Sequence, residues 1–322
     1  MIITVTLNAA IDKTLAVPNF TIGRRHRSTE QRTMAGGKGV NIARALKTLG
    51  QPVIATGLAG GPTGTRIIEQ LTDEAILSDF VRIREESRTS TAVIDPTSGK
   101  QTEINERGPR ATEAEISLFR DKLLYLAKGA DICVFAGSLP HDVDNQLYAE
   151  LIAALATAGV TTVVDAEGET MQLALRVGPD LVSPNATEAE RLVEHEFRDE
   201  QDHIYGLYEL CELGAREAII THGEGCYALV GRDHERSLYS VRVDPLEPVS
   251  AIGAGDVFLA GYLAYRYGRH SHEESLRFAV ACGAESTQHF GAGVLDPRGV
   301  ERVQSDVTVS ELEEPAPVDA RA

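Results

Sequence analysis

Residues 250–256 read Ser-Ala-Ile-Gly-Ala-Gly-Asp, and the apolar run Val-Phe-Leu-Ala-Gly-Tyr-Leu follows at 257–263. Small residues give way abruptly to a helical pattern, which predicts a loop that becomes a helix. The backbone amides of Gly253, Ala254 and Gly255 would face outward at the helix N-terminus, where they can bind an anion. Asp256 follows them, and its carboxylate can accept a proton from a hydroxyl that attacks a bound phosphate. The stretch predicts a small-molecule kinase, with a plain glycine turn and a helix N-cap as the alternative.

The rest of the chain alternates between short apolar runs and amphipathic segments. The predicted strands are 2–7, 53–58, 132–136, 161–165 and 217–221. The predicted helices are 39–49, 64–72, 112–128, 144–158 and 186–195. This order is typical of repeated βα units, so we expect a mostly parallel sheet with helices on both faces.

Two segments break this alternation. Residues 11–34 and 85–107 are rich in Thr, Val and Arg in polar alternation, which indicates antiparallel strands attached to the main body as a lid. We expect residues 1–305 to form one domain that includes this lid. Residues 306–322 mix Glu, Asp, Pro and Ala at the end of the chain, and we predict an acidic, disordered tail there.

The composition narrows the class of protein. The chain has 322 residues, 43% of them hydrophobic, and a formal net charge of −17, which argues against nucleic-acid binding. The four cysteines form no CxxC pair, so neither a zinc site nor a disulfide framework is expected. Because no apolar run is long enough to cross a bilayer, we expect a soluble protein in the reducing cytoplasm.

Two further stretches have residue types suited to a sugar. Leu-Asn-Ala-Ala-Ile-Asp at 7–12 leaves a strand for a loop, where Asp12 can accept hydrogen bonds from hydroxyls or can simply form a turn. The sequence Ala-Gly-Gly-Lys-Gly-Val-Asn at 35–41 places glycines, Lys38 and Asn41 at a helix start. It matches neither a Walker A loop nor GxGxxG, and a tight turn with a solvated lysine is the alternative.

Cations are conspicuous in the predicted lid of this acidic chain. Arg24, Arg25, His26 and Arg27 form a run, and Arg88 lies in the second lid segment. Together with Lys38 they can clamp a substrate phosphate, since arginine binds phosphate through two parallel hydrogen bonds. A solvated charged face or an interface between two lids remains the alternative.

Two later strand ends suit a nucleotide and its metal. Asn185 and Glu188 lie three residues apart at a predicted helix start, so both side chains can hold a hydrated Mg²⁺, although the same spacing is that of a capping box. Thr-His-Gly-Glu-Gly at 221–225 closes another strand with a loop suited to nucleotide phosphates, in which we interpret His222 as a spacer.

The order and content of these stretches resemble the ribokinase-like, or PfkB, family of sugar kinases from Thr6 to about Gly293. The glycine motif at 35–46 and Gly253-Ala254-Gly255-Asp256 are the most specific parts. Ser-Arg-Thr at 87–89 and Thr-Glu-Ile-Asn-Glu at 102–106 look most like the phosphosugar branch, which contains 1-phosphofructokinase, tagatose-6-phosphate kinase and the minor 6-phosphofructokinase.

The resemblance implies a three-layer α/β/α fold with a small β-sheet lid that often contributes to a homodimer. It also implies ATP as phosphoryl donor, Mg²⁺ as cofactor and K⁺ as a further activating ion. It assigns roles to this chain as follows: Asp256 as proton acceptor; Gly253, Ala254 and Gly255 as the anion hole; Asp12, Gly37, Lys38, Asn41, Arg88 and Arg27 as sugar-phosphate ligands; Asn185, Thr221, Gly223 and Gly283 as nucleotide ligands; and Glu188 as the residue that orders the metal's waters.

Two positions depart clearly from the family pattern, and Ala251-Ile252 before Gly253 is a third, mild change. Ser183 stands where the family commonly has Lys, which removes a cation near the nucleotide, and Cys226 replaces a glycine beside the phosphate loop. We expect phosphorylation of a ketohexose phosphate, with fructose 1-phosphate as first choice and tagatose 6-phosphate or fructose 6-phosphate as alternatives. A sugar-phosphate sensor without catalysis is the alternative from another class of protein.

Overall fold

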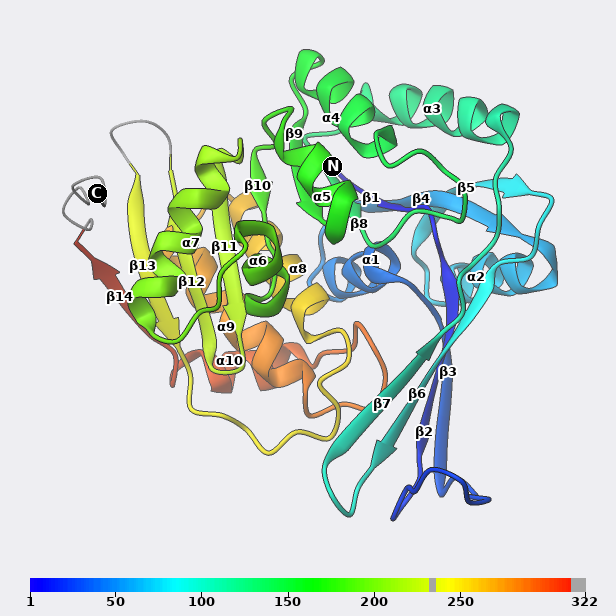
Figure 1. Ribbon diagram of the computed structural model, residues 1–322, viewed down its shortest axis with the longest axis horizontal. Helices are drawn as coiled ribbons and strands as arrows, with labels where there is room; N and C mark the ends of the chain where they lie inside the picture. The colour runs from blue at the N-terminus through cyan, green and yellow to red at the C-terminus, as the bar shows by residue number, and fades with distance from the viewer. Residues whose placement is uncertain (232–235, 314–322) are drawn as a thin grey trace.

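The computed structural model describes residues 1–231 and 236–313. Figure 1 shows a large sheet covered by helices on both faces, with a smaller sheet that projects from one end. This is a three-layer α/β arrangement with a smaller sheet attached, as the sequence predicts.

The large sheet has ten strands in the order β14-β13-β12-β11-β10-β9-β8-β1-β4-β5. Its strands are β1 (Ile2–Thr6), β4 (Val53–Gly60), β5 (Leu77–Ile83), β8 (Ile132–Ala136), β9 (Thr161–Asp165), β10 (Leu181–Val182), β11 (Glu217–His222), β12 (Gly225–Val230), β13 (Ser237–Arg242) and β14 (Thr308–Leu312). Neighbours from β5 to β11 pair in parallel, whereas β12, β13 and β14 continue the sheet in antiparallel pairs.

Two hydrophobic cores lie on the two faces of this sheet. The helices are α1 (Lys38–Thr48), α2 (Gly61–Asp73), α3 (Glu113–Ala127), α4 (Leu147–Thr157), α5 (Gly168–Leu175), α6 (Ala186–Val193), α7 (Glu200–Glu212), α8 (Ala254–Tyr267), α9 (His272–Ser286) and α10 (Pro297–Gln304). Helices α1, α2, α8, α9 and α10 contribute to one core, and α3 to α7 contribute to the other. In β1, Ile2 enters the first core while Ile3 and Val5 enter the second, as successive residues of a strand must.

The smaller sheet, which we call the lid, has the order β3-β2-β6-β7. Its strands are β2 (Ala10–Ala16), β3 (Glu30–Gly36), β6 (Arg88–Asp95) and β7 (Lys100–Asn105). The antiparallel pairs that the sequence predicts are present within each segment, but the two segments join through a parallel pair of β2 with β6. Alternation along a strand does not reveal which partner it selects.

The predicted tail is wrong at its start. Thr308–Leu312 form β14, which pairs antiparallel with β13 at the edge of the large sheet. Val309 packs against one core and Leu312 against the other, so a segment with few apolar residues is still fixed by its backbone hydrogen bonds. The rest of the predicted tail, residues 314–322, lies outside the described residues.

Within residues 1–231 and 236–313, no helix combines the length and apolar character needed to span a bilayer.

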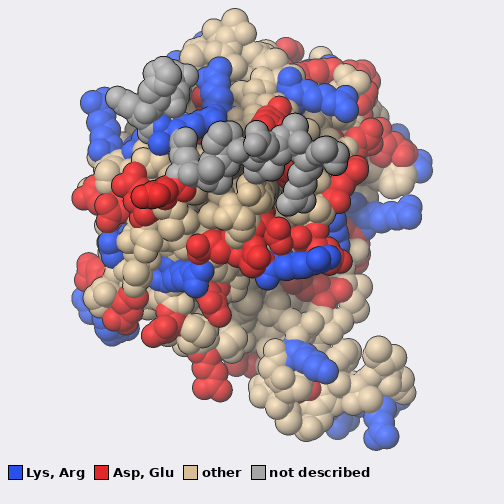
Figure 2. All heavy atoms as spheres, turned by 60° about the vertical axis from the view of Figure 1, so that its left-hand side comes forward, with Lys and Arg blue, Asp and Glu red and all other residues tan. Residues whose placement is uncertain are grey.

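Figure 2 shows acidic side chains spread over the visible face and Lys or Arg side chains near the protruding end of the lid.

Candidate active site

The carboxyl ends of the parallel strands open into a cavity of about 640 Å³ beneath the lid. Because strands of a parallel sheet end at the same edge, residues distant in sequence meet there. It is lined by these predicted site residues: Asp12, Gly37, Lys38, Asn41, Arg88, Asn185, Glu188, Thr221, Gly253, Ala254, Gly255 and Asp256.

A second cavity of about 650 Å³ adjoins the first. Thr221, Gly223 and Gly283 line it, together with Asn185 and Glu188. The two cavities share lining residues at their junction, namely Glu167, Asn185, Glu188, Thr221, Ala251, Ala254 and Gly255. Of the predicted nucleotide residues, Gly223 and Gly283 line the second cavity alone, whereas Asn185 and Thr221 line both cavities.

The predicted anion hole lies at that junction. Gly253 caps α8 with φ 76°, a left-handed conformation that favours glycine. Ala254 donates its amide to Ala251 O at 3.3 Å, whereas the amides of Gly253 and Gly255 have no protein acceptor in the described ranges. A Cβ added at Gly255 would meet nothing within 4 Å beyond its own helix, so there is open space beside this residue, whereas a Cβ at Gly253 would lie 3.0 Å from Ala292 Cβ. Of the three predicted amides, that of Ala254 is therefore already used within the loop, and the anion-binding role of Gly253 and Gly255 stays a prediction.

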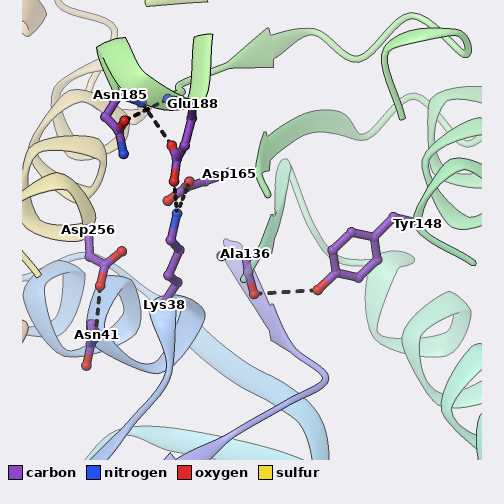
Figure 3. Close-up of polar contacts among 8 residues, drawn as sticks. All are labelled: Lys38, Asn41, Ala136, Tyr148, Asp165, Asn185, Glu188 and Asp256. Carbon is purple, nitrogen blue, oxygen red and sulfur yellow. Dashed lines mark hydrogen bonds and ion pairs between the residues drawn. The ribbon is translucent and has the colours of Figure 1, made fainter. Parts of the chain in front are cut away.

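Asp256 lies in the first turn of α8 and is 6% exposed. Its Oδ2 accepts a 2.8 Å hydrogen bond from Asn41 Nδ2, and Figure 3 shows the two side chains facing each other between α8 and α1. Burial, with the nearby carboxylate of Asp165, raises the pKa of Asp256 to about 8. Asp256 is thus a stronger base than an ordinary carboxylate, and it lines the cavity.

The side chain of Lys38 is not simply solvated, because it contacts two carboxylates. Its Nζ donates to Asp165 Oδ1 at 2.7 Å and to Glu188 Oε1 at 3.3 Å, as Figure 3 shows. Burial opposes the charge of Lys38, but the carboxylates of Asp165, Glu188 and Asp256 outweigh it and raise the lysine pKa. Lys38 is therefore already paired with carboxylates, whereas Arg88 lines the same cavity from lid strand β6.

Asp12 and Arg88 lie on the adjacent lid strands β2 and β6, and each charge influences the pKa of the other. Burial raises the pKa of Asp12, against the opposing effect of Arg88. Burial also lowers the pKa of Arg88, whose Nε donates to Asn8 O at 3.1 Å. Gly36 makes this arrangement possible, because a Cβ there would lie 2.0 Å from Asp12 Oδ2. The pair offers a hydrogen-bond acceptor and a cation to the same ligand.

Asn185 and Glu188 form the capping box that the sequence leaves as an alternative. Asn185 Oδ1 accepts the Glu188 amide at 2.9 Å, and Glu188 Oε2 accepts the Asn185 amide at 2.9 Å. The second oxygen of Glu188, Oε1, bonds Lys38. The capping role and a position at the cavity therefore coexist.

Arg27 is not brought to either cavity. It is exposed in the loop between β2 and β3, at the end of the lid farthest from the large sheet, and it lines neither space. Its assignment as a phosphate ligand stays a prediction.

The two departures from the family pattern differ in place. Ser183 is buried and lines the first cavity, just after β10. Cys226 is fully buried in the core on β12 and lines neither cavity described above. On β12 the cysteine is the register partner of Thr221 on β11.

Sequence reasoning missed several polar residues of the first cavity. They include Asn8, Gln101, Glu103, Asn105, Glu106, Arg107, Asp165 and Glu167. Asp165 could have been found, because it ends a predicted strand in the same way as Asp12 follows one. In the described part of the chain, no group of three His, Cys, Asp or Glu side chains is arranged as a complete metal site.

The comparisons with known proteins agree with this geometry. The model of the pfkB family carbohydrate kinases matches residues 5–298. The chain is 29% identical over 316 residues to a tagatose-6-phosphate kinase of Staphylococcus epidermidis, covering 97% of this chain and 100% of that protein. It is 31% identical to a 1-phosphofructokinase of Borreliella burgdorferi, covering 88% and 90%.

A solved structure of phosphofructokinase-2 from Escherichia coli in complex with substrates and products superimposes with a TM-score of 0.87 at 28% identity, covering 94% of this chain and 98% of that one. The chain therefore belongs to the pfkB family of carbohydrate kinases.

Proposed function

We propose that this kinase transfers the γ-phosphoryl group of ATP to a ketohexose phosphate, with fructose 1-phosphate as the preferred acceptor and fructose 1,6-bisphosphate as product. The observation that carries the proposal is the position of Asp256. It lines the first cavity, whose residue types suit a sugar, and directly follows Ala254 and Gly255, which also line the second cavity, whose residues suit a nucleotide. The names of the relatives support a phosphosugar as acceptor.

In the proposed reaction, the acceptor hydroxyl lies between Asp256 and the γ-phosphorus. The new O–P bond forms as the bond to the β-phosphate oxygen breaks, the hydroxyl proton passes to Asp256, and ADP leaves. The amides of Gly253 and Gly255 stabilise the charge on the transferred group. Asn41 holds the carboxylate in place through its bond to Oδ2, which leaves Oδ1 for the acceptor.

The donor set fits Mg²⁺. Asp165 and Glu188 supply carboxylate oxygens that already share one cationic group, Lys38 Nζ, and Mg²⁺ prefers one or two carboxylates together with water and phosphate oxygens. When bound, the ion would neutralise charge on the ATP phosphates. Carbohydrate kinases of this family use ATP with Mg²⁺, and a structure of phosphofructokinase-2 from Escherichia coli contains potassium, which supports K⁺ as an additional ion.

Asp12 and Arg88 would bind the sugar phosphate from the lid, and Arg27 would reach it only from a second copy or after movement of the lid. A homodimer through the lid is supported by exposed apolar side chains there: Ile22 is 93% exposed and Ile104 is 62% exposed. The four cysteines are free thiols, in keeping with a cytoplasmic protein.

A coupled assay for ADP release tests the function. The protein is incubated with MgATP and, separately, fructose 1-phosphate, fructose 6-phosphate and tagatose 6-phosphate, and kcat/KM is measured for each. The proposal requires the highest value with fructose 1-phosphate. Preference for another sugar refutes this acceptor, and the absence of ADP with every sugar supports a binding protein without catalysis.

A further inference from the structure

The lid touches the loop that leads into the anion hole. Gln101 lies on β7, whose alternate residues Gln101, Glu103 and Asn105 line the first cavity. Its side-chain Oε1 accepts a hydrogen bond of 3.2 Å from the backbone amide of Ala251, which is 150 residues away in sequence. Ala251 lies in the loop of residues 243–253 between β13 and α8, which we call the pre-helix loop.

The other bonds of this part of the loop end in the main body or in the loop itself. The amides of Val249 and Ser250 both donate to Thr287 O, at 2.8 and 3.0 Å. The amide of Ile252 donates to Ser250 Oγ at 3.3 Å. Among the recorded bonds of the 249–254 amides, the bond from Ala251 is therefore the one that ends on the lid.

Ala251 also connects the two cavities to the first turn of α8. It lines both spaces, and its carbonyl oxygen accepts the amide of Ala254 at 3.3 Å. The peptide group before Ala251 is thus held by the lid, while the group after it holds an amide of the anion hole. A shift of Gln101 relative to the main body would therefore alter the hydrogen bond that holds this peptide group.

We propose that Gln101 is a positioning residue that couples sugar binding under the lid to the arrangement of the nucleotide side of the active site. A sugar phosphate that fixes the lid strengthens the bond from Ala251 to Gln101, and this orders the pre-helix loop before the nucleotide binds. The proposal rests on the proposed function, because it needs one ligand in each cavity, and it goes beyond it by assigning the connection to one side chain.

The expected size of the coupling follows from the nature of the contact. A single neutral hydrogen bond between exposed groups changes an equilibrium by roughly three- to tenfold. Coupling between two binding sites is reciprocal, so each ligand should raise the affinity for the other by the same factor. Gln101 does not contact the reacting atoms, and its removal should reduce this factor without abolishing turnover.

Three variants distinguish the effect of the acceptor oxygen of Gln101 from the effects of side-chain size and position. Gln101→Met keeps a similar length but removes the acceptor oxygen, whereas Gln101→Glu keeps an acceptor at the same position. Thr102→Val changes the neighbouring residue, which alternates with the cavity-lining residues and so lies on the opposite face of β7. It is the matched control for a polar-to-apolar change on this strand.

The first measurement is hydrogen exchange of peptides that cover residues 243–256 in the protein without ligands. We expect faster exchange in Gln101→Met than in the wild type, and unchanged exchange in Gln101→Glu and Thr102→Val. This arm does not depend on the identity of the sugar. Equal exchange in Gln101→Met and wild type would overturn the role of the contact.

The second measurement is the dissociation constant of Mg²⁺ with the non-hydrolysable ATP analogue AMP-PNP, with and without the ketohexose phosphate that supports turnover. We expect a three- to tenfold tighter complex in the presence of sugar for the wild type, Gln101→Glu and Thr102→Val, and a factor close to one for Gln101→Met. Wild-type coupling in Gln101→Met, or none in the wild type, overturns the proposal. If no sugar supports turnover, the proposed function fails and the coupling with it, while the exchange result still reports on the contact.

Discussion

Replacement of Asp256 by Asn tests both the proposed chemistry and the electrostatics of the site. Asn41 Oδ1 accepts a hydrogen bond from Arg44 Nη1 at 3.3 Å, so its Nδ2 is fixed toward residue 256. The amide oxygen of an asparagine at 256 can accept that bond in place of Oδ2. The variant should therefore fold with the same contacts but without a base.

Turnover should fall by about 10² to 10⁴, the usual contribution of a general base. In the wild type, kcat/KM should also fall as pH drops below about 8, because the buried carboxyl, with its pKa raised to about 8, then becomes protonated. The measurement is ADP release with saturating MgATP across this pH range. An Asp256→Asn enzyme with more than a tenth of wild-type turnover would contradict the assignment.

Protonation of Asp256 should have opposite effects on activity and on stability: it lowers turnover but favours the folded protein. Asp256 holds its proton more tightly in the folded protein than in the unfolded chain, where its pKa is near 3.8. The wild type therefore loses unfolding free energy as pH rises from about 4 to about 8, and the loss is complete above that. For a single group, this amounts to about 2 to 3 kcal/mol between pH 6 and pH 9. The Asp256→Asn variant has no carboxyl at this position, so its unfolding free energy should not fall with pH in this way.

Urea denaturation of the wild type and Asp256→Asn at pH 6 and pH 9 measures the difference, and the comparison removes the contribution of other titrating groups. Asp95→Asn is the control, because hydrogen bonds from Thr97, Ser98 and Asn19 outweigh burial and lower the pKa of Asp95, so that its carboxyl stays ionised at both pH values. A stability gap between wild type and Asp256→Asn that is the same at both pH values would refute the reasoning.

Three further substitutions test the surroundings of this site. Lys38→Met should lower the unfolding free energy by about 1 to 3 kcal/mol in urea denaturation, because Asp165 and Glu188 lose their shared cation; an unchanged value would contradict that pairing. Arg88→Lys should raise the KM for the sugar phosphate roughly 10- to 100-fold with a smaller change in kcat, since lysine lacks the planar guanidinium fork. A change confined to the KM for ATP would contradict the assignment of Arg88 to the sugar phosphate. Arg44→Met should cost about 2 to 4 kcal/mol, because it leaves Glu74 without its bidentate partner, and a thermal melting curve that matches the wild type would exclude this.

Local patterns in the sequence predicted five of the ten strands of the large sheet, namely those that became β1, β4, β8, β9 and β11. The strands at 132–136 and 161–165 match β8 and β9 residue for residue, since fully buried parallel strands are short apolar runs with clear ends. The other five strands were missed: β5, β10, β12, β13 and β14. For the two-residue strand β10 and the edge strand β14, pairing depends on neighbours rather than on their own hydrophobic pattern.

The candidate site likewise combines features that the local sequence predicts with features that depend on residues far apart in the chain. Glycine at positions such as 253 and 255, with an acidic residue next to them at the start of a helix, has a local physical meaning that one sequence reveals. The bond between Lys38 and Asp165 joins residues 127 positions apart, and no local pattern encodes which carboxylate a lysine selects.

By itself, then, the sequence determined the alternation of strands and helices, the edge of the sheet where polar residues gather, and the loop-to-helix turn that presents Asp256. Tertiary structure alone decided which charges pair, that β2 joins β6, and that Gln101 of the lid reaches Ala251. The physical reason is range: backbone preference and hydrophobic periodicity act over a few residues, whereas charge partners and strand neighbours are chosen only when the whole chain is packed.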